Sequence, residues 1–329
     1  MITTELGDGL TVSALGFGGM SLTDMYGPVS DSDALRTLHH AVDSGITLLD
    51  TANGYGDGRS EITIGKLLKT RRDEIQLATK FGIVKNLGPS QRGVRGDREY
   101  VREQVELSLA RLGTDRIDLY YQHRVDPAVP IEETVGAIKE LIDEGKVLHI
   151  GLSEATGDEI RRAVTVHPIA AIQSEWSVVS RDVERWVVPA ATEHGVGFVS
   201  YSTLGRKWLT GLLDADEFVA GDVRFNITRY NRTNLAYNQP VLDEFLAIAR
   251  DADLTGAQLA LAWFYDKGRR LGLPAVSIPG TRYPERVTEN LGGLDVELSD
   301  DLVARLDALA VQVRGHRSAQ PGSVSSARE

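Results

Sequence analysis

The sequence lacks several features that would assign a protein to a particular chemistry or compartment. It has no cysteine, which excludes disulfides, thiolate zinc sites, iron–sulfur clusters and a cysteine nucleophile. No apolar run approaches the ~18 residues of a membrane helix, and the opening MITTELGDGL does not resemble a signal peptide. We therefore expect a cytoplasmic protein that does not enter a membrane.

Positive charge is also in deficit. The 329 residues include 36 Lys and Arg against 47 Asp and Glu, which leaves a net charge of −11. Such a chain is a poor general binder of nucleic acid or anionic membranes, so any basic cluster within it is a candidate anion site. Hydrophobic residues make up 42 %, enough to exclude disorder of the whole chain.

Short apolar runs recur along the chain. Each is nearly continuous in apolar residues, as expected for parallel strands buried on both faces. The eight predicted strands are Val12–Phe17, Ile46–Asp50, Ile75–Lys80, Ile117–His123, Val147–Ser153, Ile169–Ser174, Val196–Ser202 and Pro274–Pro279.

Segments with helical spacing of apolar residues lie between these runs. The predicted helices are Ser32–Ser44, Tyr100–Leu112, Ile131–Glu144, Asp158–Thr165, Asp182–His194, Val241–Ala252, Ala257–Lys267 and Pro284–Leu291. Eight strands that alternate with helices favour an α/β fold of the (β/α)₈ TIM barrel type over an open sheet.

Three segments depart from this alternation. Asp8-Gly9 lies between Ile2–Leu6 and Leu10–Val12 and predicts an N-terminal β-hairpin. The connection after the seventh strand, Thr203–Leu273, is long, and long loops in compact domains are usually functional. Residues 1–310 are expected to form one domain, and residues 311–329 a disordered, polar C-terminal tail.

Reactive side chains follow three neighbouring predicted strands. Asp50 ends the second strand and Tyr55 lies in its loop, Lys80 ends the third, and His123 ends the fourth. A Tyr hydroxyl is a weak acid of pKa about 10. A nearby ammonium would lower that pKa, a carboxylate would hold the ammonium, and a His would orient a carbonyl or relay a proton.

Taken singly, these residues have plainer explanations. Asp50 could cap a helix, Tyr55 could be a turn aromatic, and His123 could be a buried structural histidine. The interpretation as a general acid with its supporting groups depends on their convergence at the carboxyl ends of the strands, where barrels place their chemistry.

A second polar cluster follows the eighth strand and opens a helix. It includes Arg282 and Arg286, which would share a helical face if the helix begins near Arg282. The N-terminus of a helix offers free N–H groups and a favourable dipole, so this cluster predicts a phosphate site. The alternative is a solvated helix start.

Other features refine the site. Met20, Leu22, Tyr26, Phe81 and Arg124 are predicted to line the pocket. The chain has no Gly-rich dinucleotide fingerprint, and no two histidines pair with carboxylates at the spacing of metal ligands. We therefore predict no metal.

Together these motifs resemble the aldo-keto reductase superfamily, in its bacterial NADPH-dependent form. Leu49–Gly56 (LDTANGYG) is similar to the family's D-T-A-x-x-Y-G segment, and Thr79–Gly82 (TKFG) to its T-K motif. Leu112–Asp115 (LGTD), which leads to Asp118–His123 (DLYYQH), resembles the segment that ends in the family's histidine. The resemblance runs from Leu10 to about Leu309.

The resemblance implies NADPH-dependent reduction of aldehydes or ketones to alcohols. It makes Tyr55 the general acid, Lys80 the group that lowers its pKa, Asp50 the partner of Lys80, and His123 the group that orients the carbonyl. The implied cofactor-binding residues are Ser153, Gln173, Tyr201, Ser202, Leu204, Gly205, Arg206, Gly280, Thr281, Arg282, Arg286, Glu289 and Asn290. The sequence departs from the family pattern at Glu154, Thr203 and Trp176.

Two other functions remain open at this point. Lys80 could form a Schiff base in an aldolase-type barrel, or the chain could be a cofactor-sensing binding protein like some channel subunits. The expected partner is a small carbonyl substrate, and the sequence predicts no oligomeric state.

Overall fold

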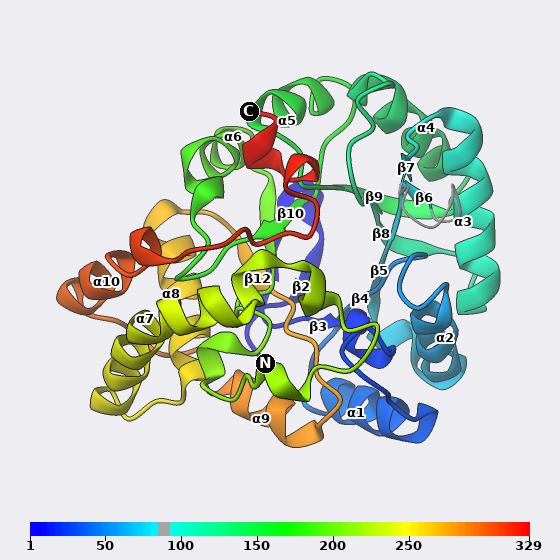
Figure 1. The fold of residues 1–329 in the computed structure, drawn as a ribbon. Coiled ribbons are helices and arrows are strands. Elements are labelled where there is room, and N and C mark those ends of the chain that lie inside the picture. Colours follow the sequence, from blue (N-terminus) through cyan, green and yellow to red (C-terminus); the bar gives the residue numbers. More distant parts are fainter. Residues whose placement is uncertain (85–92) are drawn as a thin grey trace.

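Eight parallel strands curl into a barrel that is surrounded by helices (Figure 1). A computed structural model describes residues 1–84 and 93–329. The sheet order is β12-β11-β10-β9-β8-β5-β4-β3. The two edge segments meet where the Gly16 N–H donates to the Ser277 carbonyl at 2.8 Å, next to a parallel bridge between Leu15 and Ser277. The predicted (β/α)₈ fold class is confirmed.

The barrel strands lie close to the predicted runs. They are β3 (Phe17–Gly18), β4 (Leu48–Asp50), β5 (Gln76–Phe81), β8 (Ile117–Gln122), β9 (Val147–Ser153), β10 (Ala171–Glu175), β11 (Gly197–Tyr201) and β12 (Ala275–Ser277). A small hairpin of β6 (Ile83–Val84) and β7 (Gly93–Val94) follows β5.

One predicted strand is divided between two sheets. Within Val12–Phe17, only Phe17 belongs to the barrel. Residues Thr11–Ser13 (β2) instead pair antiparallel with Thr3–Glu5 (β1). The Ser13 hydroxyl donates to the Leu15 carbonyl at 2.7 Å. This hydrogen bond lies where the chain passes from the hairpin sheet to the barrel sheet. The predicted N-terminal hairpin is therefore present, and its second strand includes Val12 and Ser13 from the predicted barrel strand.

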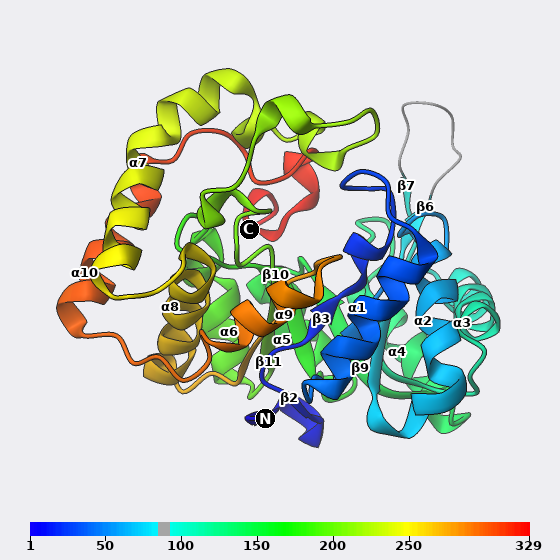
Figure 2. The same ribbon diagram turned by 90° about the horizontal axis from the view of Figure 1, so that it is seen from below.

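The hairpin covers the end of the barrel opposite the long loop (Figure 2). Leu6, Leu10 and Val12 are buried in one apolar cluster with barrel residues such as Leu119 and Val199. Burial of these side chains closes the amino-terminal end of the strands and leaves the carboxyl-terminal end for the site.

The helices form the outer layer. They are α1 (Asp31–Asp43), α2 (Arg59–Arg71), α3 (Arg98–Leu112), α4 (Ile131–Asp143), α5 (Gly157–Ala163), α6 (Val187–Glu193), α7 (Arg232–Asp251), α8 (Gly256–Leu271), α9 (Pro284–Leu291) and α10 (Asp300–Asp307). No predicted helix covers α2 or α10. The buried face of α2 includes Ser60, Glu61, Thr63 and Gly65, which weakens its apolar period.

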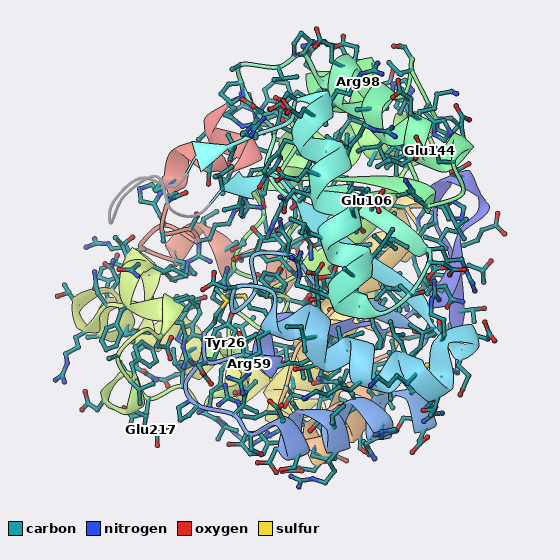
Figure 3. The ribbon with its side chains drawn as sticks, turned by 90° about the vertical axis from the view of Figure 1, so that its right-hand side faces the viewer. Tyr26, Arg59, Arg98, Glu106, Glu144 and Glu217 are labelled. Atoms are coloured by element: carbon teal, nitrogen blue, oxygen red, sulfur yellow. The ribbon has the colours of Figure 1, made fainter. Side chains whose placement is uncertain are left out.

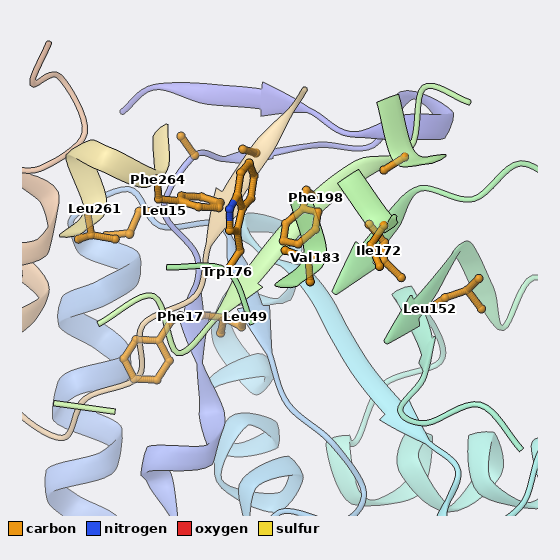
Figure 4. Close-up of a cluster of buried hydrophobic side chains, with 14 of the residues drawn as sticks. Leu15, Phe17, Leu49, Leu152, Ile172, Trp176, Val183, Phe198, Leu261 and Phe264 are labelled. Atoms are coloured by element: carbon orange, nitrogen blue, oxygen red, sulfur yellow. The ribbon is translucent and has the colours of Figure 1, made fainter. Parts of the chain in front are cut away.

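Trp176, one of the departures from the family pattern, belongs to the core. Its side chain is fully buried and packs edge-on against Phe198 and Phe264, with ring centroids 5.0 and 5.4 Å apart (Figure 4). Its indole N–H donates to Glu184 at 2.9 Å. The indole therefore fills space between barrel and helices rather than facing a ligand.

The predicted connection Thr203–Leu273 begins with an irregular loop between β11 and α7 and then contains α7 and α8. Four short 3₁₀ turns between Trp208 and Tyr230 replace regular helix in the loop. Glu217 lies on the outer part of this loop, and Tyr26 lies on the loop after β3 that faces it (Figure 3). The Val223 N–H donates to the Met25 carbonyl at 3.0 Å, so the two loops are joined.

The C-terminal residues lie on the barrel. Composition predicts disorder for residues 311–329, whereas the structure shows short 3₁₀ turns at Pro321–Ser323 and Ser325–Ala327. Arg317, Val324 and Ser325 are buried. Ion pairs and backbone hydrogen bonds, described below, replace the apolar periodicity that would have indicated this packing.

Candidate active site

A cavity of about 860 Å³ opens at the carboxyl-terminal ends of the strands. Its walls include every residue predicted to be catalytic or to bind the cofactor except Lys80 and Gly205. The described part of the chain therefore brings the predicted catalytic and cofactor segments to one cavity.

Lys80 lies beneath the cavity and connects two of its wall residues. Its ammonium forms a buried ion pair with Asp50, and it donates to the Thr51 carbonyl at 2.9 Å and to the Tyr55 hydroxyl at 3.4 Å. Gln173 donates to the second carboxylate oxygen of Asp50 at 2.8 Å. A continuous chain of polar contacts thus runs from β10 through Asp50 and Lys80 to the phenol.

The local sequence explains how Tyr55 reaches this position. Asp50 ends β4, and the chain then turns tightly, with the Tyr55 N–H donating to the Ala52 carbonyl at 3.1 Å. Gly56 and Gly58 have φ values of 58° and 88°, a region that favours glycine. The turn directs the Tyr55 ring over Lys80, whose Nζ lies 5.1 Å from the ring centroid.

Burial dominates the acidity of the phenol. Desolvation raises the pKa of Tyr55 above its usual value, and the charge of Lys80 only partly offsets this effect. The sequence predicted a net lowering, whereas in this structure desolvation outweighs the charge of Lys80. Burial would lower the pKa of Lys80, but its contacts with Asp50 and Tyr55 outweigh burial and raise that pKa.

His123 lies beside Tyr55 at the cavity wall. The two ring centroids are 5.7 Å apart at an interplanar angle of 86°. The His123 N–H donates to the Phe81 carbonyl at 2.7 Å, which places this residue where β8 leaves the sheet. Phenol and imidazole therefore border the same part of the cavity.

The neighbouring strand ends carry Ser153 and Tyr201. The Ser153 hydroxyl accepts a hydrogen bond from Arg124 at 3.3 Å. The Tyr201 hydroxyl donates to Glu154 at 2.6 Å, which anchors the ring at one edge. Both residues line the cavity together with Gln173.

The loop after β11 supplies a strained basic segment. Ser202 and Arg206 have φ values of 54° and 52°, which are uncommon for residues with a side chain. Arg206 donates to the Tyr26 hydroxyl at 2.8 Å, whereas its Nε is buried with no partner among the described residues. Gly205, outside the cavity wall, accepts from Tyr230 at 3.0 Å.

The segment after β12 supplies two further arginines. Arg282 donates to the carbonyls of Gly27 and Pro28 at 3.1 and 2.7 Å. Arg286, on α9, donates to Glu289 at 2.8 Å. Both guanidinium groups line the cavity near the start of α9.

Several wall residues were not found from the sequence. Met25 and Val223 come from the two joined loops, and Ser318, Gln320 and Ser323 come from the C-terminal segment. Of the predicted pocket residues, Met20, Tyr26 and Arg124 line the cavity, whereas Leu22 and Phe81 lie in the core. Side-chain direction at the ends of short elements caused these two errors.

Glu154 explains why the C-terminal segment reaches the cavity. Its buried carboxylate accepts from Arg317 at 2.9 and 3.0 Å and from the Ser325 N–H at 3.0 Å. Arg317 also donates to Asp182 at 2.9 Å. A charged residue in the core at position 154 was the signal in the sequence, since such a residue requires a partner.

Two absences apply to residues 1–84 and 93–329. No helix there combines the length and apolarity needed to cross a bilayer. No group of three or more His, Asp or Glu side chains in the same ranges is arranged to hold a metal ion.

Comparison with known families agrees with this geometry. The profile of the aldo/keto reductase family matches residues 14–311. The chain belongs to the aldo/keto reductase family. A curated relative from Glycine max, described as probable aldo-keto reductase 1, is 44 % identical over 294 residues, which cover 89 % of this chain and 84 % of the relative.

Solved aldo-keto reductases share the fold. A glycerol dehydrogenase from Gluconobacter oxydans superposes with a TM-score of 0.81 at 28 % identity, over 93 % of this chain and 94 % of the other. An aldo-keto reductase from Bacillus halodurans, solved in its holo form, gives a TM-score of 0.73 at 27 % identity, over 94 % and 96 %. The protein is thus an oxidoreductase of a family that acts on carbonyls with nicotinamide cofactors.

Proposed function

We propose that this aldo-keto reductase reduces aldehydes or ketones to alcohols with NADPH, and that Tyr55 is the proton donor. The observation that carries the proposal is the buried chain from Asp50 through Lys80 to the Tyr55 hydroxyl, which faces the cavity beside His123. A protonated phenol with an ammonium behind it is suited to give up a proton to a developing alkoxide.

The residues of the cavity fit NADPH. The unpartnered Nε of Arg206 and the guanidinium groups of Arg282 and Arg286 provide donors for phosphate oxygens. Gly280 approaches Gly18 so closely that a Cβ there would lie 2.3 Å from the Gly18 carbonyl oxygen, so the backbone forms part of the wall. When bound, NADPH would supply the hydride.

The chain's own residues would perform the proton chemistry. Because burial raises its pKa, Tyr55 stays protonated at neutral pH and is in the form needed for reduction. Its proton would pass to the carbonyl oxygen while Lys80 stabilises the phenolate left behind. His123 would orient that oxygen, and Ser153 and Gln173 would hold the carboxamide of the cofactor.

The Schiff-base alternative finds no support. A Schiff base requires a neutral amine that reaches the substrate. Lys80 is fully buried beneath the cavity, its contacts are with Asp50, Thr51 and Tyr55, and its pKa is raised rather than lowered. Catalytic turnover would distinguish the enzyme from a binding protein that only senses the cofactor.

The test is Tyr55→Phe, assayed by NADPH oxidation with a panel of aldehydes, ketones and quinones. We expect kcat to fall by about 10²- to 10⁴-fold, the range of general acid catalysis, while NADPH still binds. Tyr237→Phe, on α7 and outside the cavity wall, is the matched control. Unchanged turnover in Tyr55→Phe, or no turnover of the panel by the wild type, would refute the proposal.

A further inference from the structure

Arg124 is a basic group in the cavity that the proposed chemistry does not use. It directly follows His123 and its half-buried side chain lines the cavity. Its Nη1 donates to the His123 carbonyl at 2.6 Å and to the Ser153 hydroxyl at 3.3 Å. These two contacts hold the guanidinium between the end of β8 and the end of β9.

The other edge of this guanidinium is available. Among residues 1–84 and 93–329, no acceptor pairs with Nε or Nη2 of Arg124, and no carboxylate lies within ion-pair distance. An Arg side chain has five N–H donors in a planar fork. Nε and Nη2 together form the edge that matches the two oxygens of a carboxylate.

The carboxylate of Glu154, which follows Ser153, already has a cationic partner. Both oxygens of Glu154 accept hydrogen bonds from Arg317, and Tyr201 donates to one of them. Glu154 makes no ion pair with Arg124 in the described structure. The charge of Arg124 helps to lower the pKa of Glu154, but no carboxylate pairs with its guanidinium, so that group can bind an acceptor in the cavity.

The position of Arg124 separates it from the basic groups assigned to the cofactor phosphates. Arg206, Arg282 and Arg286 come from the segments after β11 and β12. Arg124 follows β8, beside the proton donor, and its charge favours the phenolate form of Tyr55. Apolar wall residues such as Met20, Met25, Ile83 and Val94 complete the lining.

We propose that Arg124 binds a carboxylate carried by the carbonyl substrate, so that the preferred substrates are short oxo acids. The apolar residues would contact the carbon chain, while the guanidinium fixes the acid group and thereby the distance of the carbonyl from Tyr55. This inference rests on the proposed carbonyl reduction and adds a substrate class to it.

The experiment compares succinic semialdehyde with its methyl ester, which has the same aldehyde and chain length without the charge. The readout is the ratio of kcat/KM for the acid to that for the ester. We expect a ratio above about 10 in the wild type and a fall of about 10- to 100-fold in Arg124→Met, the range of one charge-assisted pair. Arg124→Lys, which keeps the charge but not the fork, should retain part of the preference.

Arg36→Met is the matched control, because Arg36 is exposed and pairs with Asp33 on α1. It should leave the ratio unchanged. Added KCl should reduce the wild-type ratio, since salt screens a half-exposed charge. A wild-type ratio near one, or the same ratio in wild type, Arg124→Met and Arg124→Lys, would overturn the inference while leaving carbonyl reduction intact.

Two further outcomes separate this inference from the proposed function. No turnover of either compound, nor of the wider carbonyl panel, would refute the proposed function itself. Weaker NADPH binding in Arg124→Met with an unchanged acid-to-ester ratio would assign Arg124 to the cofactor and overturn its role toward the substrate.

Discussion

Glu154 and Arg317 form a buried, two-point ion pair across 163 residues of sequence, with N–O distances of 2.9 and 3.0 Å. Glu154 directly follows β9 and the cavity residue Ser153, and Arg317 precedes Ser318 and Gln320, which line the same cavity. The pair therefore ties the last residues of the chain to the site.

Removal of Arg317 should destabilise the fold strongly. Arg317→Met leaves the Glu154 carboxylate buried without its charge partner, which typically costs about 3–5 kcal/mol in the free energy of unfolding. Urea unfolding should show this loss, and adding Glu154→Gln should restore part of it. Arg232→Met is the control, because the Arg232–Asp216 pair is exposed and should contribute at most about 1 kcal/mol. Equal losses in the two single variants would contradict the assignment.

The same pair predicts a specific acid sensitivity. Burial alone would raise the pKa of Glu154, but the charge and hydrogen bonds of Arg317 hold it at about 2, against 4.5 for an ordinary Glu. A pKa lowered on folding adds stability above the unfolded value, and this stability disappears as pH falls toward the folded value.

The contribution of Glu154 should therefore be present above pH ~4.5 and decline between ~4.5 and ~2, with a full size of about 3 kcal/mol. The measurement is the difference in unfolding free energy between wild type and Glu154→Gln from neutral pH to pH ~3, which cancels the other carboxylates. A difference that stays constant over this range would show that the Glu154 pKa is not lowered.

Lys80 should control the pH dependence of catalysis. Its charge lowers a Tyr55 pKa that burial raises, so Lys80→Met should move this pKa further upward. In alcohol oxidation, where Tyr55 would act as the base, the pH of half-maximal rate should shift to higher values. Because Lys80→Met leaves Asp50 buried and unpaired, Lys80→Met/Asp50→Asn is the second variant, and both need a folded-state check. An unchanged pH profile in a folded variant would exclude this role.

Arg286 should favour NADPH over NADH. Arg286→Ala should weaken NADPH binding by about tenfold. The loss of affinity should be smaller than for a buried charge-assisted pair, because the Arg286 side chain is 40 % exposed and already bonded to Glu289. The affinity of this variant for NADH should change little. Arg282→Ala should weaken the binding of both cofactors, since Arg282 also donates to the carbonyls of Gly27 and Pro28. Fluorescence titration at fixed ionic strength is the measurement. A wild-type preference for NADH, or equal weakening by Arg286→Ala, would contradict the prediction.

The barrel, and the residues that converge at one end of it, can be predicted from local patterns in the sequence. The buried parallel strands are continuous apolar runs, so their period and spacing survive in the sequence, and Asp50, Lys80 and His123 stand at recognisable strand ends. The order of these strands then brings the three residues together, as any closed parallel barrel would.

The partners of the buried charges could not be predicted in this way, because they come together only in the folded chain. The net rise in the Tyr55 pKa depends on how far the fold desolvates the phenol relative to the charge of Lys80, which no local pattern encodes. Helix α2 hides Glu61 on its inner face, and the C-terminal segment is held by Glu154, Asp182 and backbone donors instead of an apolar face. Such contacts join residues far apart in the chain and produce no periodic pattern in the sequence. They can be identified only when the fold has brought both partners together in the protein interior.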